Sequence, residues 1–266
     1  MRQLVAVLCQ WVHLCAMRKI VAGNWKMHKD SDEAKALIAA LMNVDIPAGV
    51  EVVVAPPFPF LAAAVEQVAG SAIIVGAQNC HQKSQGAFTG EVSAAMLKSI
   101  GVKACIVGHS ERRQYFGETD AAVGEKIVAL LEHGITPIYC CGELKEERVG
   151  GTHFEVVSTQ MKAALGGLSP DQLKRIVVAY EPVWAIGTGL TASAEQAQEM
   201  HAHIRTLLAS HGKDVAAAVP ILYGGSCKPD NAAELFANPD VNGGLIGGAA
   251  LDAKQFSELI RIAGDR

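Results

Sequence analysis

The most informative stretch of this sequence reads Ile176-Val177-Val178-Ala179-Tyr180-Glu181-Pro182-Val183-Trp184-Ala185-Ile186-Gly187-Thr188-Gly189. Its first residues are apolar and β-branched, which predicts a buried strand of a parallel sheet. A carboxylate, Glu181, stands where that strand ends, and Pro182 stops the strand directly after it. The residues that follow are apolar and close in glycines that can absorb backbone rotation. Two hypotheses follow. Either Glu181 is a catalytic base and the segment after it is a loop that covers the site, or Glu181 is an exposed acid at a strand end and the segment only connects two elements.

Short apolar runs of this kind recur along the chain and alternate with longer, alanine-rich amphipathic stretches. The predicted strands are Ile20–Asn24, Val52–Ala55, Ile73–Gln78, Ala104–Gly108, Pro137–Cys141, Ile176–Glu181, Ile221–Gly224 and Gly244–Gly247. The predicted helices are Ser31–Asn43, Leu61–Ala69, Ala121–His133, Phe154–Leu165, Ala194–Ser210, Asn231–Ala237 and Ala253–Ala263. Eight strands alternating with helices predict an α/β fold, a single closed (β/α)₈ barrel of parallel strands with outer helices, and not an open doubly wound sheet.

Length and composition agree with one domain. The chain has 266 residues, 50% of them hydrophobic and 19% charged, which suits one barrel and is too apolar for disorder. The formal net charge of -4 gives no reason to expect binding to nucleic acid or to an anionic membrane. We therefore expect a single domain over residues 17–266.

Cysteine and histidine residues do not indicate a metal site. The seven cysteines include no C-x-x-C pair, and Cys140 and Cys141 are expected on opposite faces of one strand. His201 and His203 are two apart on a predicted helix, so they do not share a face. We expect reduced thiols, a cytoplasmic protein and no metal.

The first sixteen residues, Met1 to Ala16, are interpreted separately. Their apolar run is shorter than the ~20 residues needed to span a bilayer, and Gln10 and His13 interrupt it. Met17 directly precedes the first predicted strand. An upstream start or a dispensable extension is the preferred interpretation, and a secretory signal is the alternative.

Polar residues gather where the predicted strands end. They are Asn24, Lys26, His109, Ser110, Glu111, Glu143, Glu181 and Ser226, with the glycine pairs Gly224-Gly225 and Gly247-Gly248. Because the carboxyl ends of barrel strands meet at one face, these residues are expected to form one site. The two glycine pairs follow strands seven and eight, where barrels frequently bind phosphate through backbone N–H groups.

His109 and Lys26 suggest how such a site could handle a carbonyl compound. His109 stands at the start of a short predicted helix, whose dipole disfavours a second positive charge, so a neutral imidazole is expected. Lys26 could stabilise negative charge on a substrate oxygen, and the Asn24 amide could hydrogen-bond the same region. The sequence Gly108-His109-Ser110-Glu111-Arg112 lacks the second glycine of a nucleophile elbow, which argues against a serine hydrolase.

Several stretches of the chain together form a family pattern. They are Ala22-Gly23-Asn24-Trp25-Lys26-Met27, Gly76-Ala77-Gln78-Asn79, Gly86-Ala87-Phe88-Thr89-Gly90-Glu91, Val107-Gly108-His109-Ser110-Glu111-Arg112-Arg113, Cys140-Cys141-Gly142-Glu143, Glu181 to Gly189, Tyr223-Gly224-Gly225-Ser226 and Gly247-Gly248. They are colinear and cover the chain from Arg18 to the last helix, and in them the chain resembles the triosephosphate isomerase family. The resemblance implies a TIM barrel and cofactor-free interconversion of dihydroxyacetone phosphate and D-glyceraldehyde 3-phosphate in glycolysis and gluconeogenesis.

The resemblance also implies a role for each site residue. Glu181 would be the base, His109 the neutral proton shuttle, and Lys26 and Asn24 would stabilise the enediol(ate) oxygens. The phosphate would be bound by Gly187, Ser226, Gly247 and Gly248. The supporting residues would be Glu111 beside Lys26, Ser110, and Cys140 as a buried thiol. The lid would be Pro182, Val183, Trp184, Ala185, Ile186, Gly187, Thr188 and Gly189.

A homodimer is implied as well. The segment from Gln78 to Glu91 resembles the family's interdigitating loop, with Thr89, Gly90 and Glu91 at the contact. Thr89 would approach Asn24 and Lys26 of the other subunit.

Two alternative functions stay open: another barrel enzyme of phosphorylated sugars or indole precursors, and a catalytically silent barrel that serves as a binding module. The residues alone predict a barrel enzyme acting on a small phosphorylated carbonyl compound.

Overall fold

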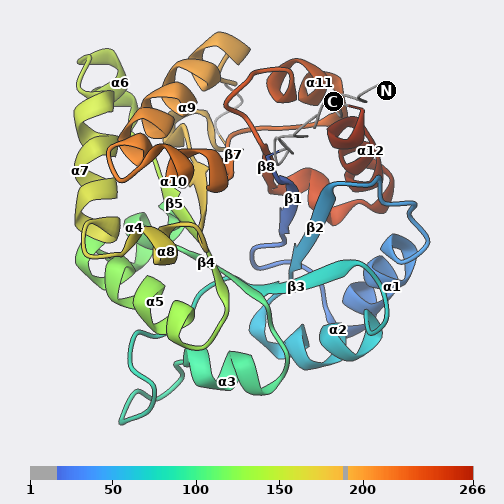
Figure 1. The fold of residues 1–266 in the computed structure, drawn as a ribbon. Helices are drawn as coiled ribbons and strands as arrows, with labels where there is room; N and C mark the ends of the chain where they lie inside the picture. Colours follow the sequence, from blue (N-terminus) through green and yellow to red (C-terminus); the bar gives the residue numbers. More distant parts are fainter. Residues whose placement is uncertain (1–16, 188–190, 266) are drawn as a thin grey trace, which may run out of the picture.

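The chain folds into a closed barrel of eight parallel strands surrounded by helices (Figure 1). The computed structural model describes residues 17–187 and 191–265, so the expectation for residues 1–16 lies outside the described residues. The strands are β1 (Lys19–Asn24), β2 (Val50–Ala55), β3 (Ile73–Ala77), β4 (Ala104–Val107), β5 (Thr136–Cys141), β6 (Val177–Tyr180), β7 (Ile221–Tyr223) and β8 (Gly243–Ile246). The prediction of a (β/α)₈ barrel is confirmed.

The helices form the outer layer. They are α1 (Ser31–Leu41), α2 (Leu61–Gln67), α3 (Ala94–Ser99), α4 (Ser110–Phe116), α5 (Asp120–Glu132), α6 (Lys145–Val149), α7 (His153–Leu165), α8 (Pro170–Leu173), α9 (Ala194–Ala209), α10 (Lys213–Ala218), α11 (Pro229–Phe236) and α12 (Ala253–Gly264). Three 3₁₀ turns complete the list: η1 (Phe58–Phe60), η2 (Val183–Ala185) and η3 (Gly248–Leu251). The short helices α3, α6, α8 and α10 are absent from the sequence prediction.

The strands are mostly apolar because both of their faces are buried, and their polar residues stand at or near strand ends: Lys19, Asn24, Glu51 and Thr136. Ile20 and Ala22 of β1 point into the barrel, whereas Val21 packs outward against the helices. Cys140 lies inside the barrel and Cys141 in the outer core, which confirms that these neighbours occupy opposite faces. Parallel pairing of β1 with both β2 and β8 closes the sheet. Such two-sided burial explains the continuous apolar runs of the sequence.

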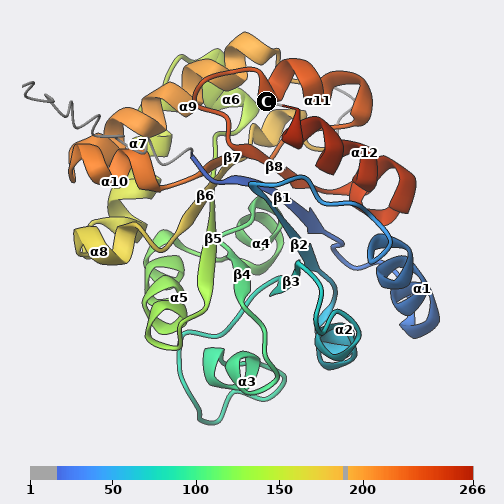
Figure 2. The same cartoon turned by 45° about the vertical axis from the view of Figure 1, so that its right-hand side comes forward.

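One long connection leaves the barrel between β3 and α3. It projects from the body of the molecule in both views (Figures 1 and 2). A bridge between His81 and Ser93 ties its two ends together, and the Ser93 hydroxyl caps α3. This connection contains the segment predicted to contact a second subunit.

His201 is a buried histidine between α9 and the barrel. Its Nδ1 lies 3.2 Å from the Asp240 carbonyl oxygen, and its ring stands edge-on to that of Tyr180 at 5.8 Å. Burial lowers the pKa of His201 to about 4, from an ordinary value of 6.5. As the pH falls, the unfolded chain therefore takes up a proton at His201 at a higher pH than the folded chain does.

The pH dependence of stability should report this residue. Because the pKa of His201 is depressed in the folded protein, the contribution of the neutral side chain to the free energy of unfolding is complete above pH 6.5. That contribution is lost as the pH falls toward 4. We expect the free energy of unfolding to fall by up to about 3 kcal/mol from this source over that window. Denaturant unfolding of wild type and His201→Gln at several pH values measures the effect. An equal slope in both proteins would contradict it.

Candidate active site

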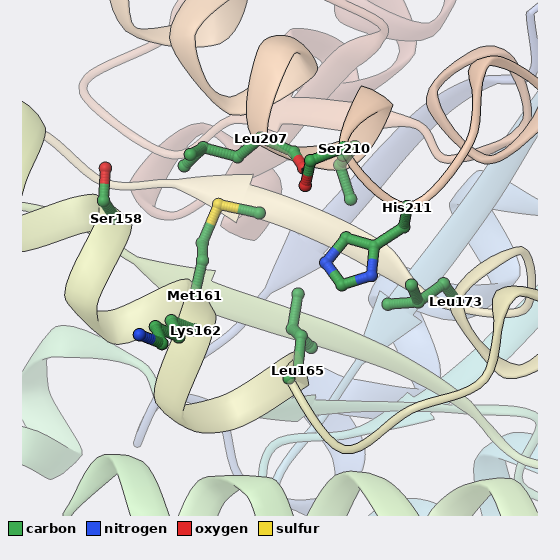
Figure 3. Close-up of a pocket in the computed structure, with 10 residues that line it drawn as sticks. Ser158, Met161, Lys162, Leu165, Leu173, Leu207, Ser210 and His211 are labelled. Carbon is green, nitrogen blue, oxygen red and sulfur yellow. The ribbon is translucent and has the colours of Figure 1, made fainter.

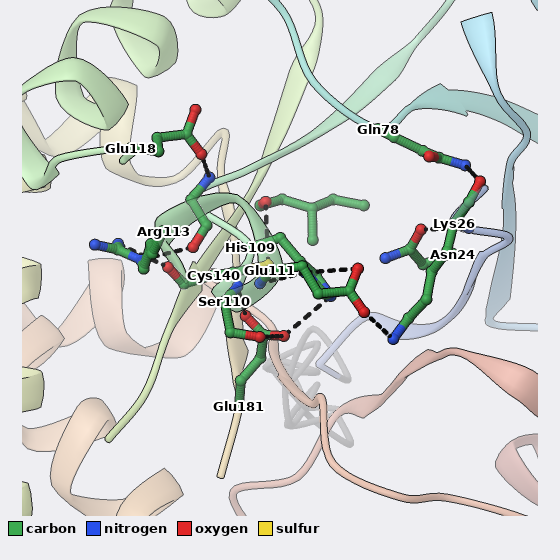
Figure 4. Close-up of polar contacts among 12 residues, drawn as sticks. Asn24, Lys26, Gln78, His109, Ser110, Glu111, Arg113, Glu118, Cys140 and Glu181 are labelled. Atoms are coloured by element: carbon green, nitrogen blue, oxygen red, sulfur yellow. Dashed lines mark hydrogen bonds and ion pairs between the residues drawn. The ribbon is translucent and has the colours of Figure 1, made fainter. Parts of the chain in front are cut away.

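Six of the residues predicted to form a site lie together at the carboxyl ends of the strands (Figure 4): Asn24, Lys26, His109, Ser110, Glu111 and Glu181. Glu181 follows β6 directly and is only 1% exposed. Its Oε2 accepts a hydrogen bond from the Ser110 backbone N–H at 2.9 Å, and its Oε1 accepts one from the Ser110 hydroxyl at 3.0 Å. Residues 71 apart in sequence are thus in direct contact, because β4 and β6 end at the same face.

Glycine makes room for the Glu181 side chain. A Cβ added to Gly224 would lie 2.9 Å from the Glu181 Cγ, which is closer than side chains tolerate. Gly224 follows β7, which pairs with β6. Packing against Glu181 therefore requires glycine at position 224, independently of any role in phosphate binding.

His109 lies between Glu181 and Glu111. Its Nδ1 accepts a hydrogen bond from the Glu111 backbone N–H at 3.2 Å, and its Nε2 lies 3.1 Å from Glu181 Oε1. Because an imidazolium has no acceptor nitrogen, this pattern assigns a neutral ring with its proton on Nε2. The proton then points at the Glu181 carboxylate, and His109 caps α4 through Nδ1.

The backbone before His109 is held by an arginine. Gly108 has φ +74°, and a Cβ there would lie 3.0 Å from the Cys140 carbonyl oxygen. Arg113 Nε donates to the Gly108 carbonyl at 2.7 Å, and its Nη2 donates to that of Cys140 at 3.2 Å. Burial raises the pKa of the Cys140 thiol well above its ordinary value, so this thiol is no nucleophile.

Lys26 approaches the site from the loop after β1. Its Nζ donates to Glu111 Oε1 at 2.6 Å, and its backbone N–H donates to Asn24 Oδ1 at 3.0 Å. Lys26 and His109 therefore contact the same carboxylate residue, since His109 Nδ1 lies 3.6 Å from Glu111 Oε2. The structure brings together four of the predicted residues, from the ends of β1 and β4.

A pocket of about 470 Å³ opens beside these residues. Its lining residues are Asn24, Lys26, His109, Ile186, Gly187, Gly224, Gly225, Ser226, Cys227, Lys228, Leu245, Gly247, Gly248, Ala249 and Gln255. All six predicted phosphate or substrate residues are among them. Glu181 does not line this pocket, because Ser110 holds its carboxylate behind His109.

Lys228 in this lining was missed by the sequence prediction, which recognised Lys26 as the sole lysine at the strand ends. Lys228 precedes α11, four residues after Gly224, and an anion-binding loop after β7 was the available signal. A second cation thus adds to the positive charge of the pocket. Gln78, which donates to the Lys26 carbonyl, was predicted only as the first residue of the dimer segment and was given no role in the site.

The stem of the predicted lid is anchored on Glu143. Trp184 Nε1 donates to Glu143 Oε1 at 2.8 Å, and the Tyr180 hydroxyl donates to the same oxygen at 3.0 Å. The Val183 backbone N–H donates to the Glu143 carbonyl at 3.1 Å. Burial raises the pKa of Glu143, and the two side-chain hydrogen bonds oppose that rise. Thr188 and Gly189 of the predicted lid lie outside the described residues.

Another hollow lies away from these residues, in the outer helix layer. It measures about 390 Å³ and is lined mainly by apolar side chains of α7, α8 and α9, and the His211 ring lies among Met161, Leu165 and Leu173 (Figure 3). It contains none of the residues predicted to act in the site. Within residues 17–187 and 191–265, no cluster of three or more histidine, cysteine or acidic residues suits a metal ion.

Comparison with known proteins identifies the family. A model of the family described as Triosephosphate isomerase matches residues 19–263. The chain belongs to this family. It is 53% identical over 250 residues to a triosephosphate isomerase of Bacteroides fragilis, a match that covers 92% of this chain and 98% of the relative.

Other relatives agree. A triosephosphate isomerase of Cytophaga hutchinsonii is 51% identical over 248 residues, with 92% of this chain and 98% of the relative covered. One of Moorella thermoacetica is 51% identical over 243 residues, with 91% and 98% covered. The resemblance inferred from sequence motifs is confirmed, which removes the alternative of another phosphate-binding barrel. In the described part of the chain, no helix is long and apolar enough to cross a bilayer.

Proposed function

We propose that this chain is a triose-phosphate isomerase that interconverts dihydroxyacetone phosphate and D-glyceraldehyde 3-phosphate through an enediol(ate). The observation that carries the proposal is the 3.1 Å contact between His109 Nε2 and Glu181 Oε1, beside a pocket that Lys26 and two glycine pairs line. A base, a proton shuttle and an anion site are the parts that this reaction requires.

Glu181 is the proposed base. An α-proton next to a carbonyl is weakly acidic, so the carboxylate needs a dry site and a free oxygen aimed at the carbon. Both Glu181 oxygens now accept hydrogen bonds from Ser110. Proton abstraction therefore requires Glu181 to leave Ser110 and enter the pocket, and Ser110 acts as its resting partner.

Lys26, Asn24 and His109 are proposed to stabilise the oxygens of the enediolate. The Lys26 ammonium supplies positive charge, and the His109 Nε2–H donates to one oxygen and can return the proton to the other. Glu111 supports Lys26 through the 2.6 Å ion pair. Cys140 is proposed as a structural residue below the site.

The phosphate is proposed to bind at Gly187, Ser226, Gly247 and Gly248. Gly248 opens the turn η3, whose first N–H groups have no partner within the turn and suit an anion. The lid, Pro182 to Gly189, would close over this anion and exclude water from the intermediate. Because Glu181 directly precedes the lid, closure of the lid and release of the Glu181 carboxylate from Ser110 would involve neighbouring residues of one segment.

A homodimer is also proposed, with the segment Gln78 to Glu91 of each subunit reaching its partner. Thr89, Gly90 and Glu91 are exposed near the end of the projecting connection. A hollow of about 330 Å³ beside Lys26 is the proposed receptor. Apolar side chains at its rim support an interface, since Met27 is 94% exposed and Phe116 69%.

Thr89→Glu tests this assembly. A charge buried without a partner at the contact should raise the dimer dissociation constant by about 10²–10³-fold and leave inactive monomers. Sedimentation velocity together with the isomerase assay measures both quantities. Thr206→Glu, on the exposed face of α9, is the matched control and should stay dimeric. An active Thr89→Glu dimer would refute the proposed contact.

We further propose that the protein acts in the cytoplasm, in glycolysis and gluconeogenesis, without a cofactor, and that residues 17–266 are the catalytic unit while residues 1–16 lie outside it. N-terminal sequencing of the native protein tests the boundary.

An assay that couples product formation to a dehydrogenase tests the reaction itself. Activity on D-glyceraldehyde 3-phosphate, retained in EDTA, is expected. A properly folded but inactive protein would favour the catalytically silent binding module.

A further inference from the structure

Gly142 stands directly after β5, at the point where this strand stops pairing with its neighbour. The parallel register of β5 with β6 ends at the pair Cys141 and Tyr180. One further bond runs from the Glu181 N–H to the Cys141 carbonyl at 2.8 Å. Because backbone N–H and C=O groups inside a protein need partners, the two groups of Gly142 must be bound by something other than a strand.

A glutamine of α7 binds both of these groups. Gln160 Oε1 accepts the Gly142 N–H at 2.9 Å, and Gln160 Nε2 donates to the Gly142 carbonyl at 2.9 Å. The side-chain amide thus takes the place of a neighbouring strand at the end of β5. Gln160 has no role in the function proposed above.

Gly142 in turn packs directly against the backbone of the proposed base. A Cβ added at Gly142 would overlap the Glu181 carbonyl oxygen, so only glycine fits at this position. The place of Gly142 therefore limits where the backbone of Glu181, and of the lid stem that follows it, can lie.

The next residue, Glu143, anchors the stem of the lid. Its side chain is buried, and its Oε1 accepts hydrogen bonds from Trp184 Nε1 and the Tyr180 hydroxyl. Its backbone carbonyl accepts the Val183 N–H at 3.1 Å. Gln160 therefore binds the residue directly before the one on which these three hydrogen bonds converge.

We propose that Gln160 is a positioning residue for the isomerase reaction: by holding Gly142 it places Glu143, and thereby anchors Val183 and Trp184 where the lid can close over the substrate phosphate. This inference rests on the proposed function. The competing account is that Gln160 only fastens α7 to β5, so that its loss lowers stability and leaves the chemistry unchanged.

Loss of phosphate from the enediolate distinguishes the two accounts. In this side reaction the enolate electron pair forms a double bond between C2 and C3, while phosphate leaves with the electrons of the C3–O bond. The enol that remains moves its hydroxyl proton to C3 and becomes methylglyoxal. A lid that holds the phosphate suppresses this loss. The amount of methylglyoxal per isomerisation therefore reports on the lid, whatever fraction of the protein is folded.

Gln160→Met keeps the side-chain length and removes the amide. It should raise methylglyoxal per isomerisation of D-glyceraldehyde 3-phosphate by about tenfold, with a fall in kcat, as expected when a group is misplaced from outside the site. In a Trp184→Phe background, which lacks the N–H donor to Glu143, the same substitution should raise this ratio by about twofold at most. An equal rise in both backgrounds, or an unchanged ratio in Gln160→Met, would overturn the proposal.

Gln67→Met is the matched control, because Gln67 Nε2 donates to the Lys35 carbonyl at 2.9 Å on the outer helices. Its methylglyoxal ratio should equal that of wild type. If Gln160→Met does not fold, Gln160→Glu enters the same cycle with the same outcomes, because it keeps an acceptor for the Gly142 N–H and loses the donor to the carbonyl. A wild-type protein without isomerase activity would refute the proposed function, whereas an active wild type with an unchanged ratio in the variant refutes only the role of Gln160.

Discussion

Glu181→Gln should lower kcat by about 10³–10⁴-fold, at the upper end of what a positioned general base contributes. The amide has nearly the same shape and can still accept a hydrogen bond from Ser110, so the fold should persist. It cannot take a proton from carbon, which is the step assigned to this residue. Steady-state kinetics with D-glyceraldehyde 3-phosphate measures the loss, and competition by inorganic phosphate measures whether the anion site is intact.

Two comparisons make this result specific to the base. Inhibition by inorganic phosphate should be unchanged, because the carboxylate lies outside the pocket lining. Glu51→Gln neutralises a carboxylate near the amino end of β2, where it pairs with Arg18, and should retain full activity. Near-normal kcat in Glu181→Gln would end the proposed mechanism.

Lys26→Met should lower kcat/KM by about 10²–10³-fold, the range seen when one preorganised group that stabilises an oxyanion is lost. The substitution keeps the length of the side chain and removes the charge. The loss should be present in kcat as well as in KM, because charge on the substrate oxygen grows as the proton leaves carbon.

Lys29→Met is the matched control for this change. Lys29 lies in the same loop and also has positive φ, at 75°, yet it does not line the pocket. Its kinetic constants should match those of wild type. Equal losses in the two variants would indicate a general electrostatic effect and would contradict a specific role for Lys26.

Much of the fold could be predicted because two-sided burial leaves a strong sequence signal. Strand β6 illustrates this, since Val177 to Tyr180 are all buried and all apolar or aromatic. The helices α3, α6, α8 and α10 were not predicted, since they are only four to six residues long. At that length local caps, such as the Ser93 hydroxyl on the Met96 N–H, outweigh any helical periodicity.

The site was predictable as a set of residues and less so as a set of contacts. The rule that barrel strands end at one face placed His109 and Glu181 together. It gave no sign that Ser110 would hold the Glu181 carboxylate, or that Gln78 would reach the Lys26 carbonyl across 52 residues. Those contacts depend on strand register and side-chain rotamers, which a single sequence does not encode in any local pattern.

Turnover in D₂O tests the central claim, that Glu181 moves a proton between neighbouring carbons, most directly. A carboxylate that carries the proton can exchange it with solvent before returning it, so proton NMR should find deuterium at C2 in part of the D-glyceraldehyde 3-phosphate formed from dihydroxyacetone phosphate. Glu181→Gln should slow both turnover and this labelling by about 10³–10⁴-fold. Rapid isomerisation by the wild-type protein with no deuterium in the product would indicate direct hydride transfer between the carbons and would contradict the account.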